Sequence, residues 1–150
     1  MKPSETVDLH IKFLWHSIAN LYNQLAFEHD LTQATGCVLL NIDEEMGTPA
    51  TKIAPLMRME ATSLSRVILK MEDESLLYRE KGKDDGRLVR IHLTETGLKK
   101  KKIAKKVVKE FNQYVIDRMD KKELACYFDS MRSINRIVEE YKIEKFGGNE

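Results

Sequence analysis

The segment from Met59 to Thr94 restricts the fold more than any other, because it predicts a helix followed directly by a two-stranded hairpin. In its first half, apolar residues recur at the i, i+3, i+4 and i+7 spacing of one helix face, namely Leu64, Val67, Ile68 and Met71. Asp85-Gly86 then favours the positive-φ backbone of a hairpin turn. The returning strand alternates in polarity, which predicts one buried face. Residues of that face are Val89, Ile91 and Leu93, and the other face carries Leu88, Arg90 and His92.

The surface that this segment is predicted to expose is polar and basic, as contact with duplex DNA requires. A helix of this kind fits the major groove, and a cationic hairpin fits over phosphates or into the minor groove. The candidate DNA-binding residues are Thr62, Ser63, Ser65, Arg66, Lys70, Lys81, Lys83, Asp85, Arg87 and Arg90.

Two arginines have the most specific predicted roles. Arg66 is expected to form a bidentate contact with a guanine or a phosphate, because its guanidinium offers paired donors. Arg87 is expected to enter the minor groove, where the negative potential is enhanced. Asp85, two residues earlier, is expected to orient the Arg87 guanidinium. The alternative for Arg66 is that it lies on a merely solvated helix face. The alternative for Arg87 is that it is an ordinary exposed turn residue.

Composition excludes several other classes of protein. The 150 residues include 25 basic and 24 acidic side chains, with a net charge of +1, so any DNA contact must come from local clustering of charge. Neither a signal peptide nor a run of about 20 apolar residues is apparent, which predicts a cytoplasmic protein with no membrane partner. The cysteines and histidines lack metal-ligand spacing, and no phosphate loop or nucleophile–base pair is present. Neither a cofactor nor an enzymatic activity is therefore expected.

Helices are predicted on both sides of the segment. Residues 5–29 carry an apolar stripe at helical spacing, and residues 98–143 predict two amphipathic helices divided at 117–120. The lysines between Lys99 and Lys109 alternate with apolar residues, which favours a solvated helix face over a DNA contact. Two shorter helices are expected at about 32–45 and 49–57, the second capped by Thr48 with Pro49 in its first position. A short helix, a turn and a second helix form the helix-turn-helix layout.

Three short motifs in this arrangement resemble the MarR family of bacterial transcription regulators. The predicted recognition helix begins with a cluster of small hydroxyl residues that ends in arginine, Ala61-Thr62-Ser63-Leu64-Ser65-Arg66. The wing contains an Asp-x-Arg pattern, Asp85-Gly86-Arg87, followed at the expected spacing by Leu93-Thr94-Glu95-Thr96-Gly97. The resemblance covers nearly the whole chain.

The resemblance implies a mainly α fold with a small β-hairpin wing (α+β), in which a winged helix-turn-helix is flanked by long terminal dimerisation helices. One MarR-like domain would span residues 1–150, with dimerisation helices at 5–29 and 98–143 and the DNA-binding region at 32–95. The implied protein is a homodimeric repressor that binds a palindromic operator on double-stranded DNA. A small aromatic or other organic effector would bind between the dimer helices and the winged region. A winged-helix ligand sensor, or a protein-interaction module with little DNA readout, is the alternative.

Two groups of residues outside the DNA-binding segment have competing interpretations. Cys37 lies among apolar residues, so a small buried hydrophobe is the simplest interpretation. Trp15, Tyr22 and Phe13 either line an effector pocket or pack in the core or the dimer interface, and packing is favoured.

Overall fold

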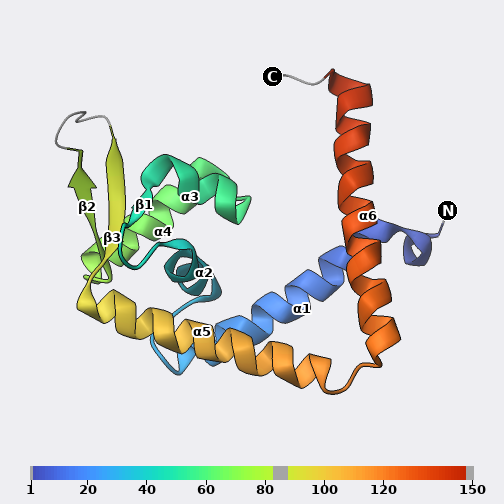
Figure 1. The fold of residues 1–150 in the computed structure, drawn as a ribbon, viewed down its shortest axis with the longest axis horizontal. Coiled ribbons are helices and arrows are strands. Elements are labelled where there is room, and N and C mark those ends of the chain that lie inside the picture. Colours follow the sequence, from blue (N-terminus) through green and yellow to red (C-terminus); the bar gives the residue numbers. More distant parts are fainter. Residues whose placement is uncertain (1, 83–87, 148–150) are drawn as a thin grey trace. The chain divides into compact units, whose positions relative to one another are not determined.

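The computed structural model describes residues 2–82 and 88–147 (Figure 1). After a 3-10 helix at Pro3–Glu5, the elements are α1 (Val7–Phe27), α2 (Gln33–Asn41), β1 (Thr48–Pro49), α3 (Ala50–Met57), α4 (Ala61–Asp73), β2 (Leu77–Lys81), β3 (Val89–Leu93), α5 (Glu95–Ile116) and α6 (Lys121–Phe146). The chain divides into two compact units, Met1–Val108 and Lys109–Glu150. A mainly helical chain with a small antiparallel sheet confirms the predicted fold class.

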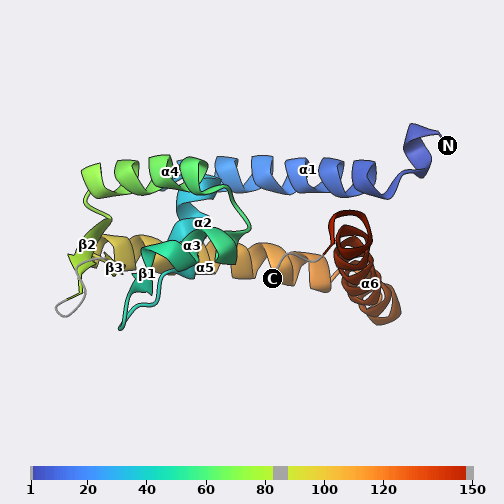
Figure 2. The same cartoon turned by 90° about the horizontal axis from the view of Figure 1, so that it is seen from above.

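The core of the first unit forms where α2, α3 and α4 pack against the sheet. Apolar side chains predicted to face inward do so: Leu64, Ile68 and Met71 of α4 are buried, and so are Ile91 and Leu93 of β3. They meet Val38 and Leu39 of α2 and Ile53 of α3 in one cluster. Two views place α2 between α4 and α5 (Figures 1 and 2). Helix α2 is therefore the element that links the recognition helix to α5.

The second unit comprises the end of α5 and all of α6. The break between them lies at the predicted position, because Asp120 caps α6. Its carboxylate accepts a hydrogen bond from the Lys122 backbone N–H at 2.8 Å, and the Glu123 carboxylate accepts one from the Asp120 N–H at 3.3 Å. This reciprocal pair is a capping box, which satisfies N–H groups that have no partner within the helix.

The sheet has three strands in the order β1-β3-β2, not the two of the predicted hairpin. β1 pairs antiparallel with β3, with Thr48 opposite Ile91 and Pro49 opposite Arg90. The predicted cap at Thr48 is therefore wrong, because its hydroxyl accepts a hydrogen bond from the Asp43 N–H at 2.9 Å instead. Pairing with β3 extends the backbone at this point, and α3 begins only at Ala50.

Helix α2 also ends earlier than predicted, at Asn41. The reason is Asp43, whose carboxylate accepts hydrogen bonds from the backbone N–H groups of Glu45 (3.0 Å) and Met46 (2.7 Å). Those N–H groups are thus removed from helical pairing and held in a turn. The same two bonds hold the pKa of Asp43 below its usual value. Gly47 completes the turn with a φ of +63°, and any Cβ there would lie 2.6 Å from the His92 ring.

The Leu93-to-Gly97 motif fixes the start of α5 against the end of α4. The Thr94 hydroxyl donates to the Ser75 carbonyl at 2.7 Å and accepts from the Gly97 N–H at 3.0 Å. These bonds bring Gly97 so close to Leu76 that a Cβ on it would lie only 1.9 Å from the Leu76 carbonyl oxygen. Because that oxygen belongs to the backbone, a side chain at residue 97 cannot be accommodated by rotation alone.

Gly97→Ala should therefore destabilise the fold by about 3 kcal/mol, the upper part of the range for forced overpacking. The matched control is Thr96→Ala on the exposed neighbouring position, which should change stability by no more than about 0.5 kcal/mol. Urea unfolding followed by circular dichroism measures both. Equal unfolding midpoints for the two variants would show that the close approach at Leu76 is not a constraint.

Candidate nucleic-acid interface

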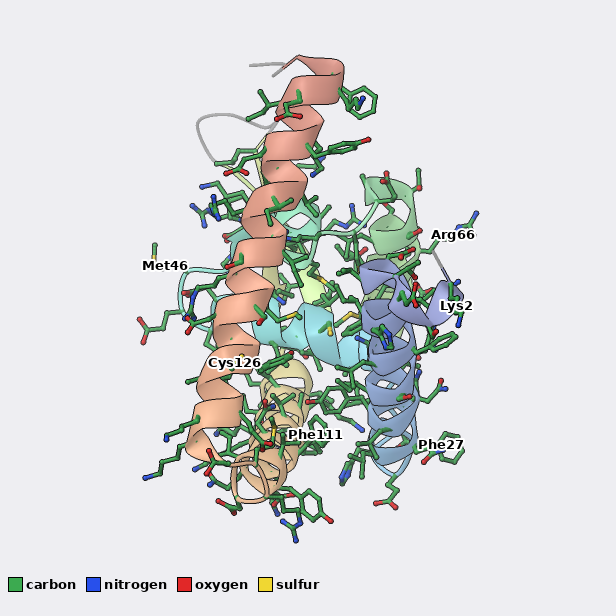
Figure 3. The ribbon with its side chains drawn as sticks, turned by 90° about the vertical axis from the view of Figure 1, so that its right-hand side faces the viewer. Lys2, Phe27, Met46, Arg66, Phe111 and Cys126 are labelled. Carbon is green, nitrogen blue, oxygen red and sulfur yellow. The ribbon has the colours of Figure 1, made fainter. Side chains whose placement is uncertain are left out.

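Helix α4 separates its apolar and polar residues onto opposite faces. Leu64, Ile68 and Met71 fix one face in the core. The candidate contact residues are all exposed on the remaining surface: Thr62, Ser63, Ser65, Arg66 and Lys70. The Arg66 side chain extends outward from the ribbon (Figure 3). The first turn of α4 contains no acidic residue, and the residue before it, Glu60, is the N-cap.

Two polar contacts orient side chains on and beside α4. The Ser65 hydroxyl donates to the Ala61 carbonyl at 2.8 Å, so it is held on its own helix and retains acceptor capacity. Arg79 of β2 forms an ion pair with Glu72 of α4 at 2.9 Å. That pair joins the first wing strand to the recognition helix. No local sequence pattern indicates this pair, because the two residues lie on different elements.

The wing continues as a regular antiparallel pair as far as the structure describes it. Lys81 lies opposite Val89, and the Gly82 N–H donates to the Leu88 carbonyl at 2.8 Å. Lys81 is exposed at the end of β2. Lys83, Asp85 and Arg87 lie outside the described residues, and their predicted roles remain predictions.

Arg90 has a structural contact that its predicted role did not include. Its side chain is half-buried, and Nη1 donates to the backbone carbonyls of Met46 (3.2 Å) and Gly47 (3.3 Å). Arg90 therefore holds the loop between α2 and β1 against β3. A guanidinium has further donors, so this contact leaves the predicted DNA contact untested.

An apolar pocket lies between α1, α2 and α5, with a cavity volume of about 60 Å³. Its walls are formed by Tyr22, Ala26, His29, Leu31, Thr32, Gln33, Gly36, Cys37, Leu40, Ile103, Ala104, Val107 and Val108. Trp15 and Phe13 are exposed and lie outside it. No local sequence pattern indicated the pocket, because it forms only where α5 meets α1 and α2, which lie far from it along the chain.

Cys37 is half-buried in the wall of this pocket rather than fully enclosed in the core. The Gln33 side-chain amide donates to its sulfur at 3.1 Å. Burial raises the pKa of the Cys37 thiol. The thiol therefore stays protonated at neutral pH, in which state it is a poor nucleophile.

Known proteins resemble this chain in sequence. Residues 31–89 match the model of the MarR family. The uncharacterized HTH-type transcriptional regulator YpoP of Bacillus subtilis (strain 168) is 25% identical over 124 residues, covering 80% of this chain and 79% of the relative. The chain therefore resembles MarR-family regulators, and the family match covers residues 31–89.

Two solved structures share this fold. S. aureus MepR, in a complex with DNA, superposes with a TM-score of 0.81 at 19% identity, covering 87% of this chain and 97% of MepR. PcaV of Streptomyces coelicolor, in complex with its natural ligand, superposes with a TM-score of 0.78 at 19% identity. The superposition covers 91% of this chain and 96% of PcaV. MarR-family members are transcription regulators and not enzymes.

Most lysines of α5 are exposed, as predicted, but Lys100 is half-buried and Lys101 is buried. Lys101 is only 5% exposed, and its ammonium donates to the Ile42 carbonyl at the end of α2. Lys100 donates to the His29 carbonyl, and Lys105 bonds to the Glu44 carboxylate. Three of these lysines therefore contact the segments that follow α1 and α2.

Within the described residues, 2–82 and 88–147, no helix is both long enough and apolar enough to span a bilayer. Within the same ranges, His, Cys, Asp and Glu residues do not gather in groups of three that could hold a metal ion.

Proposed function

We propose that this protein is a homodimeric transcriptional repressor that binds a palindromic operator and is released from it by a small organic effector. The observation that carries the proposal is α4, which is fixed in the core by one face and exposes hydroxyl and basic side chains on the other. Recognition helices of the helix-turn-helix class place such residues in the major groove. The likeness to MepR, whose structure is a complex with DNA, supports this assignment.

Residues 32–95 would form the DNA-binding region, in which some residues contact bases and others contact the phosphate backbone. Arg66 would read a base edge or clamp a phosphate. Lys70, Lys81 and Lys83 would contact phosphates, which fix register without reading sequence. Arg87 would enter the minor groove, with Asp85 orienting it.

The terminal helices, at 5–29 and 98–143, would form the dimer interface. Neither α1, with 21 residues, nor α6, with 26 residues, has a single buried residue. Both nevertheless carry large apolar side chains that are exposed, among them Val7, Ile11, Leu14, Trp15, Tyr127, Phe128, Ile137, Val138 and Tyr141. Apolar surface of this extent marks an interaction site, and two-fold assembly with a second copy is the commonest solution for soluble proteins.

The effector would bind in the pocket between α1, α2 and α5. Its walls are mainly aliphatic, which suits an aromatic or other apolar molecule. The likeness to PcaV, solved with its natural ligand, supports a ligand-responsive regulator.

Selection from random duplexes tests the proposed function. The purified protein should enrich an imperfect palindrome whose half-sites are about 10 base pairs apart, because a two-fold symmetric dimer presents its recognition helices about one DNA turn apart. Enrichment of a lone asymmetric half-site would contradict the symmetric arrangement. Failure to enrich any sequence would contradict sequence-specific DNA binding and favour a ligand-sensing or protein-binding module.

A further inference from the structure

The pocket between α1, α2 and α5 is smaller than the molecules that it would accept. Its volume is about 60 Å³, whereas a dry apolar cavity that accepts benzene in another protein has about 150 Å³. The space within the walls is therefore less than that of a cavity that holds one aromatic ring. At Gly36 of α2 the walls approach closely, since an added Cβ there would just reach van der Waals distance, 4.0 Å, from the Ala104 Cβ of α5.

Two adjacent lysines of α5 bond to backbone carbonyls that follow two different helices. Lys100 donates to the His29 carbonyl just after α1, and its ammonium lies 3.8 Å from the Asp30 carboxylate. Lys101 donates to the Ile42 carbonyl just after α2. Carbonyls at a helix C-terminus lack partners within the helix, and the dipole makes that end negative. Both lysines thus bind where a cation is favoured.

A shared carboxylate strengthens the contact with α2. Glu44, in the loop after α2, bonds to Lys105 and lies 3.4 Å from the Lys101 ammonium. The hydrogen bond from Lys105 holds the pKa of Glu44 below its usual value, so the carboxylate is charged at neutral pH. Lys101 is buried, and a buried cation that loses its partners is costly. The contact therefore resists separation of α2 from α5.

We propose that Lys100, Lys101 and Lys105 form a clamp that holds α1 and α2 against α5 and controls how readily the pocket opens. Opening the pocket requires these contacts to stretch or break, because the helices that they join are the pocket walls. Helix α2 lies between α5 and α4 (Figures 1 and 2), so movement of α2 away from α5 would also shift the support of α4. The clamp rests on the effector pocket of the proposed function, whereas its test uses no DNA, so the clamp and DNA binding can fail separately.

Cys37 reports on opening, because it lines the pocket and burial suppresses its thiolate. The experiment uses full-length protein carrying Cys126→Ser, which removes the exposed second thiol. The probe is dithiodipyridine, a neutral aromatic disulfide. The Cys37 thiolate attacks one of its sulfurs, forming a mixed disulfide and releasing thiopyridone, whose absorbance gives the rate.

Glu44→Gln and Lys105→Gln each weaken the clamp at exposed or partly exposed positions, so neither should prevent folding. Their controls carry the same charge changes outside the clamp. Glu45→Gln alters the neighbouring carboxylate in the same loop, and Lys99→Gln alters a lysine that pairs with Glu95 within α5 itself. Each clamp variant should accelerate labelling of Cys37 by about fivefold, as expected for loss of one partly exposed charged contact, while each control should match the parent.

Urea separates local opening from unfolding of the whole chain. Below the unfolding transition, the accelerated rate should depend only weakly on urea, because local opening exposes little surface. Two results would overturn the proposal: labelling of Glu44→Gln at the same rate as Glu45→Gln, or acceleration with the steep urea dependence of global unfolding.

Discussion

Leu14→Glu should convert the protein from a dimer to a monomer at micromolar concentration. Leu14 lies on the α1 stripe with Val7, Ile11 and Trp15, side chains that are 40–53% exposed in the single chain. If a second copy covers this stripe, the substitution buries an unpaired carboxylate, which costs several kcal/mol. The dimer dissociation constant should rise by at least about 100-fold, the factor for about 2.7 kcal/mol. Sedimentation velocity measures the change.

The matched control is Lys12→Glu, which introduces the same side chain on α1 at a polar position away from the stripe. It should remain dimeric. Leu14→Glu should also lose binding to a palindromic duplex, because a monomer engages one half-site at a time. A Leu14→Glu protein that stays dimeric would show that the stripe of α1 is not part of the interface.

Arg66→Ala should reduce affinity for the selected duplex by about 10- to 100-fold, since a bidentate base contact contributes about 1–3 kcal/mol. The substitution should also relax specificity at one position of each half-site, because the guanidinium reads a base edge there. Circular dichroism should be unchanged, as the side chain is exposed. Fluorescence anisotropy with a set of single-base variants of the duplex measures both effects.

Two control variants separate the geometry of Arg66 from its charge. Arg66→Lys keeps the charge but loses the paired donors, so it should remain several-fold weaker than the parent. Lys102→Ala removes an exposed charge from α5 and should change affinity only slightly, mainly through the salt dependence. Wild-type affinity in Arg66→Ala would exclude Arg66 from the interface.

The elements that the sequence predicted correctly are those with strong local patterns. The spacing of Leu64, Ile68 and Met71 fixes the buried face of α4, because helical periodicity places them together whatever the tertiary context. Alternation from Val89 to Leu93 similarly predicts which side of β3 is buried. The exposed polar face of α4 follows from the same periodicity, so its candidate contact residues could be named in advance.

The features that the sequence did not predict depend on contacts between distant residues. β1 consists of two residues, too few to show alternation, and exists because Thr48 and Pro49 pair with β3. The pocket needs three helices at once. Lys101 belongs to a run of lysines, and lysine side chains ordinarily lie in solvent. Its burial is favourable only because the Ile42 carbonyl and the Glu44 carboxylate lie beside it. Arg90 is similar, because its partners lie more than forty residues away.

A salt titration of DNA binding tests the central claim, a DNA-reading dimer, most directly. Fluorescence anisotropy would compare the selected palindrome with a scrambled duplex of equal length and composition. The palindrome should be preferred by about 1,000-fold or more. Its affinity should fall by about 1,000-fold between 50 and 200 mM salt, the loss expected when about six phosphate contacts release counterions. Equal affinity for the two duplexes, or affinity that does not change with salt, would contradict the account.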